Sequence, residues 1–203
     1  MIRLSLNQIK TETIKAAKGI KLEYGLADDL GNMCACLADH NINFSNDICY
    51  LLNKYSKIKY YPNIICKNKQ SALVAPFIAK SLTEFIICKK NKWEGYVFSP
   101  QFLIASMSLF SQENNIQFSL KDHKNKLVAI TQNSHINLYT KSFKLSYYIL
   151  SLERTVNNFK SSNLTKDFVN YSIDEKEWKI ITSYGKRTFV KDSTRSKEKG
   201  AGY

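Results

Sequence analysis

The hydrophobic pattern changes its period near residue 115, and this change constrains the fold of the 203-residue chain more than any other feature. Before Asn115 the apolar residues recur three or four positions apart, as on one side of an α-helix, and after it they alternate with polar residues, as in half-buried strands. Helices that precede strands predict an α+β fold, because a doubly wound sheet needs the two to alternate. We expect a single domain, mainly helical over residues 1–114, with an antiparallel sheet, a late helix and a glycine-containing tail over residues 115–203.

Three helices are expected in the first 60 residues. Ser5 and Gln8 have the spacing of a capping box, which predicts that a helix begins there and runs to about Lys18. A second helix is predicted over residues 24–40, and its apolar side includes Gly31. Glycine costs about 1 kcal/mol inside a helix, so this position predicts a close helix–helix approach. The third helix is expected to begin at Ser45.

Prolines indicate where two further helices begin. Pro76 suits the first turn of a helix over residues 76–85. Ser99 and Pro100 read as an N-cap followed by a proline at the first helical position, for a helix that ends near Asn114.

Four strands of an antiparallel meander are expected after residue 115, because the apolar residues alternate and polar turns separate the segments. The predicted strands are residues 116–120, 126–132, 136–139 and 144–152. A final helix is expected from Asp174, with Glu177 bonding back to the cap residue in a reciprocal arrangement.

The formal charge of +13 resembles that of nucleic-acid-binding proteins, but its composition argues against that function. Lysine supplies 26 of the 30 basic residues and arginine only 4, and the lysines are scattered along the chain. Arginine is the residue that recognises phosphates and bases in a bidentate manner. Nucleic acid is therefore the least favoured partner.

Neither a metal nor a cofactor is expected. The five cysteines form no CxxC pair, no histidine lies at ligand spacing from them, and dinucleotide-binding and phosphate-binding glycine motifs are missing. No apolar run approaches the length of a membrane span, and the N-terminal residues lack the apolar core of a signal peptide. We expect a cytoplasmic protein with free thiols.

Two charged pairs and one histidine are candidate site residues with simpler structural interpretations. Asp28 and Asp29 are adjacent, so they do not share a helical face and are expected to be solvated. Glu153 and Arg154 could orient a polar ligand, although a surface ion pair is the simpler interpretation. His40 closes a helix, where an imidazole interacts favourably with the last carbonyl groups.

The C-terminal tail is the predicted ligand site. An anchor of Thr188, Phe189 and Val190 precedes hydroxyl, arginine and glycine residues, and such a set can hold an anion with guanidinium groups and exposed amides. The predicted ligand-binding residues are Arg187, Ser193, Thr194, Arg195, Ser196, Gly200 and Gly202.

Three segments also resemble a bacterial family of unknown function, whose pattern opens with KAARGxGLxxGLAEEAG and closes with RTYVPxSExSRxxGAG. The matching residues are 15–19 (KAAKG) with 24–31 (YGLADDLG), 75–77 (APF), and 187–196 (RTFVKDSTRS) with 200–202 (GAG). Lys191 stands where the family pattern has proline. The resemblance implies a bacterial, soluble, single-domain protein and implies no reaction.

Two functions follow from the tail. In the first, the protein binds a small anionic metabolite, as an enzyme or as an accessory subunit of a metabolic enzyme. In the second, the tail is an arm that docks on a neighbouring subunit, so that the protein is a homo-oligomer or the partner of an enzyme. The sequence contains no recognisable nucleophile, general base or metal set, so no reaction is predicted.

Overall fold

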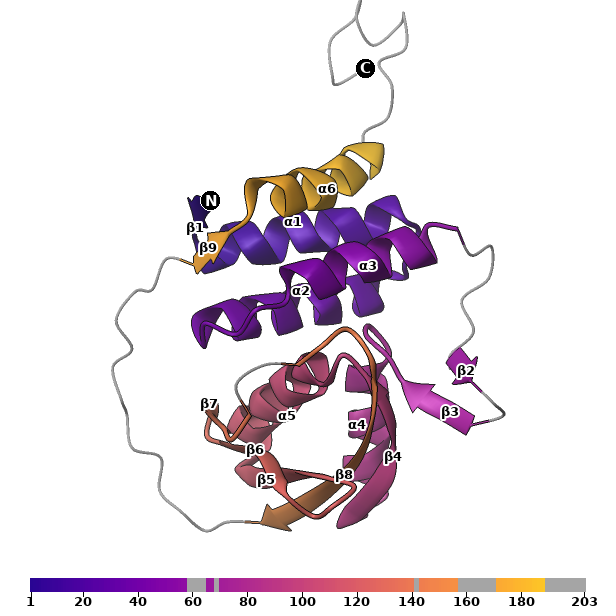
Figure 1. Ribbon diagram of the computed structural model, residues 1–203, viewed down its shortest axis with the longest axis vertical. Helices are drawn as coiled ribbons and strands as arrows, with labels where there is room; N and C mark the ends of the chain where they lie inside the picture. The colour runs from indigo at the N-terminus through magenta and orange to yellow at the C-terminus, as the bar shows by residue number, and fades with distance from the viewer. Residues whose placement is uncertain (58–64, 68–69, 141–142, 157–170, 189–203) are drawn as a thin grey trace, which may run out of the picture.

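A computed structural model describes residues 1–57, 65–67, 70–140, 143–156 and 171–188 of the chain. It shows a layer of helices packed against a second part, in which a sheet curves around one helix (Figure 1). The predicted α+β class is confirmed, with helices in the N-terminal region and a largely antiparallel sheet after it.

The helical layer contains α1 (Leu6–Gly19), α2 (Tyr24–Asp39), α3 (Ser45–Tyr55) and α6 (Glu175–Gly185) (Figure 1). Helix α1 lies between α2 and α6, and α3 packs on α6. Helix α1 begins as predicted, because the Ser5 hydroxyl accepts from the amide of Gln8 at 3.2 Å and the Gln8 side chain accepts from the amide of Ser5 at 2.9 Å. A two-stranded antiparallel sheet of β1 (Ile2–Leu4) and β9 (Tyr171–Ile173), which the sequence did not predict, completes this layer.

The second part is built on a seven-stranded sheet in the order β2-β3-β4-β8-β5-β6-β7. All neighbouring strands are antiparallel except β3 and β4, which are parallel. The strands are β2 (Ile65–Lys67), β3 (Gln70–Leu73), β4 (Lys92–Phe98), β5 (Ile116–Asp122), β6 (Leu127–Gln132), β7 (His135–Leu138) and β8 (Tyr147–Val156).

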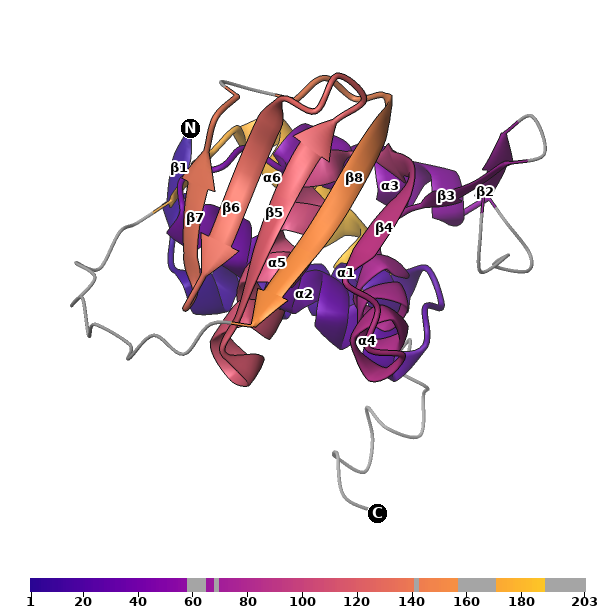
Figure 2. The same ribbon diagram turned by 90° about the horizontal axis from the view of Figure 1, so that it is seen from below.

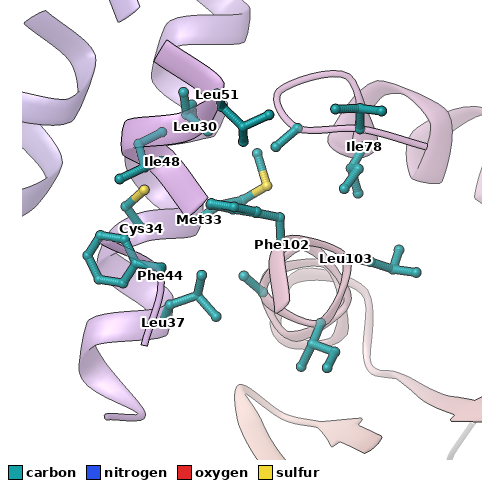
Figure 3. Close-up of a cluster of buried hydrophobic side chains, with 14 of the residues drawn as sticks. Leu30, Met33, Cys34, Leu37, Phe44, Ile48, Leu51, Ile78, Phe102 and Leu103 are labelled. Carbon is teal, nitrogen blue, oxygen red and sulfur yellow. The ribbon is translucent and has the colours of Figure 1, made fainter. Parts of the chain in front are cut away.

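Helix α5 (Pro100–Asn114) lies between the sheet and the helical layer, and α4 (Ile78–Ile87) packs beside it (Figures 1 and 2). Phe102 and Leu103 of α5 are fully buried; Figure 3 shows Phe102 beside Met33 of α2. Burial of such side chains stabilises a fold by about 1.5–3 kcal/mol each, so this core holds the two parts together.

The predicted meander is wrong in its last step. Strand β8 pairs with β5 on one side and with β4 on the other, not with β7. Strand β4 was not predicted, because Gly95 and its polar neighbours interrupt the alternation over Lys92–Phe98. Alternation identifies a strand from local residues, whereas the choice of neighbour depends on contacts far along the chain.

Three local predictions also need correction. Helix α4 begins at Ile78, two residues after Pro76. Ser99 precedes α5 but makes no capping hydrogen bond, because its backbone adopts a left-handed conformation with φ 54°. The cap of α6 is not reciprocal: Asp174 accepts from the amides of the first turn, but the Glu177 carboxylate accepts instead from the hydroxyl of Ser45 in α3.

Candidate functional site

The structure describes one of the seven predicted tail residues. Arg187 lies in a 3-10 turn, η1 (Lys186–Thr188), is exposed, and has its guanidinium 4.3 Å from the ring centroid of Tyr184. The other six predicted ligand residues lie outside the described residues; they are Ser193, Thr194, Arg195, Ser196, Gly200 and Gly202. The predicted grouping of this set is therefore still a prediction.

A cavity of about 470 Å³ lies at the rim of the sheet, between the β5–β6 hairpin and the segment that leads from β7 into β8. We call it the rim cavity. Its walls are formed by aromatic and aliphatic side chains, with a few polar groups at the hairpin. The lining residues are Asp122, His123, Lys126, Leu127, Val128, Tyr139, Thr140, Phe143, Tyr147, Tyr148, Ile149 and Leu150.

Contacts between neighbours orient the aromatic wall of the rim cavity. Phe143 and Tyr148 meet edge to face, with ring centroids 5.9 Å apart and an interplanar angle of 89°. The Tyr148 hydroxyl accepts from the amide of Lys144 at 2.8 Å. Such contacts fix a ring in one orientation, so this wall is formed before any ligand arrives.

The aromatic wall continues from β8 to the helical layer. Tyr147 contacts Phe98 with centroids 4.9 Å apart, and Phe98 contacts Tyr50 of α3 at 5.4 Å. The ammonium group of Lys54 lies 5.7 Å from the Phe98 centroid and 5.8 Å from that of Tyr50. Burial lowers the pKa of Lys54, and burial followed by the nearby Tyr50 raises the pKa of Tyr147. A single group of rings thus connects the rim cavity with α3.

The polar groups of the rim cavity are concentrated at the β5–β6 hairpin. Among the described residues, Asp122 is the one acidic residue that lines the rim cavity, and its carboxylate already accepts from the amides of Lys126 at 2.9 Å and Lys124 at 2.8 Å. The bond from the Lys126 amide, followed by that from Lys124, lowers the pKa of Asp122. His123 and the Lys126 ammonium group are exposed at the same hairpin. The hairpin therefore offers the Lys126 ammonium group and the His123 ring to a ligand, while its carboxylate is engaged by the turn.

The two charged pairs that the sequence offered as candidates differ in outcome, and the expected ion pair between Glu153 and Arg154 is wrong. Glu153 forms an ion pair with Lys121 on β5, whereas a guanidinium nitrogen of Arg154 donates to the carbonyl oxygen of Ile86 at 3.3 Å. Asp29 lines a second cavity that does not include Asp28. Asp28 and Asp29 were predicted not to share a helical face, and Asp29 alone of the two lines this cavity, although the charge of Asp28 contributes to the raised pKa of Asp29.

Sequence reasoning missed the rim cavity. Tyr139, Phe143, Tyr147 and Tyr148 are close together in the chain, and this local excess of rings was the available signal. The same stretch reads equally well as the strand that was predicted there. The cavity also depends on how the segment crosses the rim from β7 to β8, which local patterns do not determine.

A group of polar side chains is buried where α3 meets the turn between β4 and α5. Asp47, Ser99 and Gln101 are all less than 10% exposed, and an oxygen atom of each lacks a hydrogen-bond partner among the described residues. Burial raises the pKa of Asp47; the nearby Ser99 and Gln101 side chains oppose this rise, and the charge of Glu177 adds to it. None of these three residues lines the rim cavity, so they are not part of the candidate site.

Comparison with known proteins identifies one family. Residues 4–75 match the model of a family described as "Protein of unknown function (DUF3726)". The predicted resemblance to an uncharacterised family is thereby confirmed, over α1, α2, α3 and the segment that leads to Ala75. No curated protein and no solved structure matches the chain.

The described part of the chain contains neither a membrane-crossing helix nor a cluster of metal ligands. None of the helices there has the length and apolar character needed to cross a membrane. Over the same residues, no three acidic, histidine or cysteine side chains are grouped so that they could hold a metal ion.

Proposed function

We propose that the protein binds a small anionic metabolite with an apolar or aromatic body in the rim cavity. The observation that carries this proposal is the combination of an aromatic wall with His123 and Lys126 at one hairpin. Rings and aliphatic side chains would bury the body of the ligand, and the Lys126 ammonium group, with the His123 ring as a hydrogen-bond donor, would engage its carboxylate or phosphate.

The volume of the rim cavity and the exposure of its apolar side chains support this proposal. Ligand sites in proteins commonly have volumes of about 300–1,000 Å³ and combine apolar walls with few polar groups, and the rim cavity of about 470 Å³ meets both conditions. Tyr139 is 53% exposed and Ile149 is 39% exposed. A bound ligand would shield these apolar surfaces from water.

The proposed binding of a metabolite also implies a cellular location and a role in metabolism. The protein would act in the bacterial cytoplasm, either as an enzyme or as an accessory subunit of a metabolic enzyme. Among the described residues, Cys34, Cys36, Cys49 and Cys88 form no disulfide, which supports a reducing compartment. The alternative role of the tail as an arm between subunits, and with it homo-oligomerisation, rests on residues outside those the structure describes.

Three probes that share parts of one molecule test the proposal: 3-phenylpropionate, the uncharged 3-phenylpropanol, and propionate, which lacks the ring. Calorimetric titration of the full chain should give the tightest binding for 3-phenylpropionate. Lys126→Gln should weaken that binding by about threefold to tenfold, because a charge-assisted contact contributes about 1 kcal/mol.

Lys124→Gln is the matched control, since Lys124 is in the same turn and does not line the cavity. Its affinity for 3-phenylpropionate should stay within about twofold of wild type. Equal losses in the two variants, or equal binding of 3-phenylpropionate and 3-phenylpropanol, would refute anion recognition at this hairpin. Absence of binding by all three probes at millimolar concentration would count against the cavity as a site for such ligands.

A further inference from the structure

A second cavity, of about 320 Å³, lies where α2, α4 and α5 meet. We call it the helix cavity. It is separate from the rim cavity, because no residue that the structure describes lines both. Each helix contributes polar side chains to it, and the three that carry charge are Asp29 of α2, Lys80 of α4 and Glu113 of α5.

The charges in the helix cavity are not paired with each other. Among the described residues, no ion pair joins Lys80 to Asp29 or to Glu113, although all three line the same space. Burial, followed by the charge of Asp28, raises the pKa of Asp29. The carboxylate of Asp29 therefore carries a desolvation cost that a neighbouring cation would offset.

A buried hydroxyl at the helix cavity also has spare bonding capacity. Ser106 is 1% exposed and donates to the sulfur atom of Met33 at 3.1 Å. A thioether sulfur is a weak acceptor, and a hydroxyl can accept as well as donate. Among the described residues, the Met33 sulfur is the one partner found for the Ser106 hydroxyl, so its oxygen is available to accept from a ligand.

We infer that the helix cavity binds a small zwitterion, with an ammonium group at Asp29 and Glu113 and a carboxylate at Lys80. The carboxylates and the Ser106 hydroxyl accept hydrogen bonds from the ammonium group, and the Lys80 ammonium group donates to the ligand carboxylate. A ligand with one charge would leave the opposite protein charge unmatched. This inference does not depend on the function proposed for the rim cavity.

A length series of amino acids with terminal charges tests the inference: 4-aminobutanoate, 5-aminopentanoate and 6-aminohexanoate, with pentylamine and pentanoate as singly charged counterparts. Titration of the full chain should show that one of the three zwitterions binds more tightly than both counterparts. Asp29→Asn should weaken that binding by about tenfold or more, the effect expected from losing one charge-assisted bond.

Asp28→Asn is the matched control, because it removes the same charge from the adjacent residue, which does not line the cavity. Its affinity should remain within about twofold of wild type, as expected when a charge makes no direct contact. Lys80→Gln should reduce binding of the zwitterion and leave that of pentylamine unchanged, whereas Lys126→Gln in the rim cavity should change neither. Equal losses in the Asp28 and Asp29 variants, equal binding of pentylamine and the zwitterions, or no binding of any probe at millimolar concentration would overturn the inference.

Discussion

The ring nitrogen Nε2 of His40 lies 2.8 Å from the carbonyl oxygen of Ser134, so the end of α2 is tied to the turn between β6 and β7. The other ring nitrogen, Nδ1, lies 2.8 Å from the carbonyl oxygen of Cys36 in the last turn of α2. The neutral ring carries one N–H and donates to one of these oxygens, and the protonated ring donates to both. The predicted interaction of His40 with the helix end is present, but the ring also joins the two parts of the molecule.

Replacement of this ring should destabilise the fold. His40→Ala should lower the free energy of unfolding by about 0.5–1.5 kcal/mol, because the ring contacts are lost while the Ser134 carbonyl keeps the Ser108 hydroxyl as a donor and the Cys36 carbonyl keeps the His40 amide. His123→Ala is the control, since His123 is exposed in a turn and its loss should cost less than about 0.5 kcal/mol. Urea unfolding of the two variants measures the difference, and equal stabilities would show that the His40 contacts contribute nothing.

Gly31 and Gly25, both in α2, should respond to alanine with opposite signs. A Cβ at Gly31 would lie 2.5 Å from Cγ1 of Ile14 and 3.0 Å from the carbonyl oxygen of Lys10, whereas a Cβ at Gly25 would meet nothing within 4 Å. Gly31→Ala should cost about 1–3 kcal/mol through overpacking of α1 against α2. Gly25→Ala should add up to about 1 kcal/mol, because alanine favours the helix. Thermal unfolding of both variants checks the signs, and stabilisation by both would contradict the close approach.

Sequence patterns correctly predicted the features that depend on residues close to one another in the sequence. Ser5 and Gln8 are three residues apart, and their capping box is present. The close approach at Gly31 was also inferred, because a glycine on the apolar face of a helix leaves room for a neighbouring helix. Predictions failed where a distant partner competes: Glu177 was expected to cap its own helix, but it accepts from Ser45, 132 residues away in the sequence.

The rim cavity was not predicted for the same reason, because it depends on contacts between residues that are distant in sequence. The sequence indicates that aromatic residues are frequent after Tyr139, but it does not indicate that Tyr147 will pair with Phe98 on the neighbouring strand β4. That contact exists because β8 inserts between β4 and β5, and strand order is set by the sum of many distant contacts. The tail residues were chosen by composition, and composition does not determine where a segment lies.

The contact between Ser45 and Glu177 should hold α3 to α6. Glu177→Ala removes the acceptor in α6 from the buried Ser45 hydroxyl, which keeps the Asn43 side-chain oxygen at 3.1 Å, and should cost about 0.5–1.5 kcal/mol. Glu175→Ala is the control in the same helix turn, because the pair of Glu175 with Lys179 is exposed and screened by solvent, so its loss should leave the free energy of unfolding nearly unchanged. Chemical denaturation compares the two variants. A loss for Glu175→Ala as large as that for Glu177→Ala would indicate a general effect of charge at the start of α6.

Asp47 and Asp122 should make the stability of the fold depend on pH in opposite directions. Burial raises the pKa of Asp47 in the folded protein. At pH values just above the ordinary pKa of aspartate, the folded state therefore retains a proton that the unfolded state has lost. Stability from this group is therefore present at low pH and lost as the pH rises through that window. Hydrogen bonds from the amides of Lys126 and Lys124 lower the pKa of Asp122 in the folded protein. The stability that Asp122 contributes is therefore present at pH values above the ordinary pKa of aspartate and is lost as the pH falls below it.

Unfolding of Asp47→Asn and Asp122→Asn at several pH values, each compared with wild type, separates these effects. The range from about pH 3 to pH 7 spans the ordinary pKa of aspartate. As the pH rises over this range, Asp47→Asn should become progressively more stable relative to wild type. Over the same range Asp122→Asn should become progressively less stable relative to wild type. Because both substitutions replace a carboxylate by an amide of the same shape, a general effect of net charge would move both differences in the same direction. Parallel trends would therefore mean that the burial of Asp47 does not disfavour its charged form.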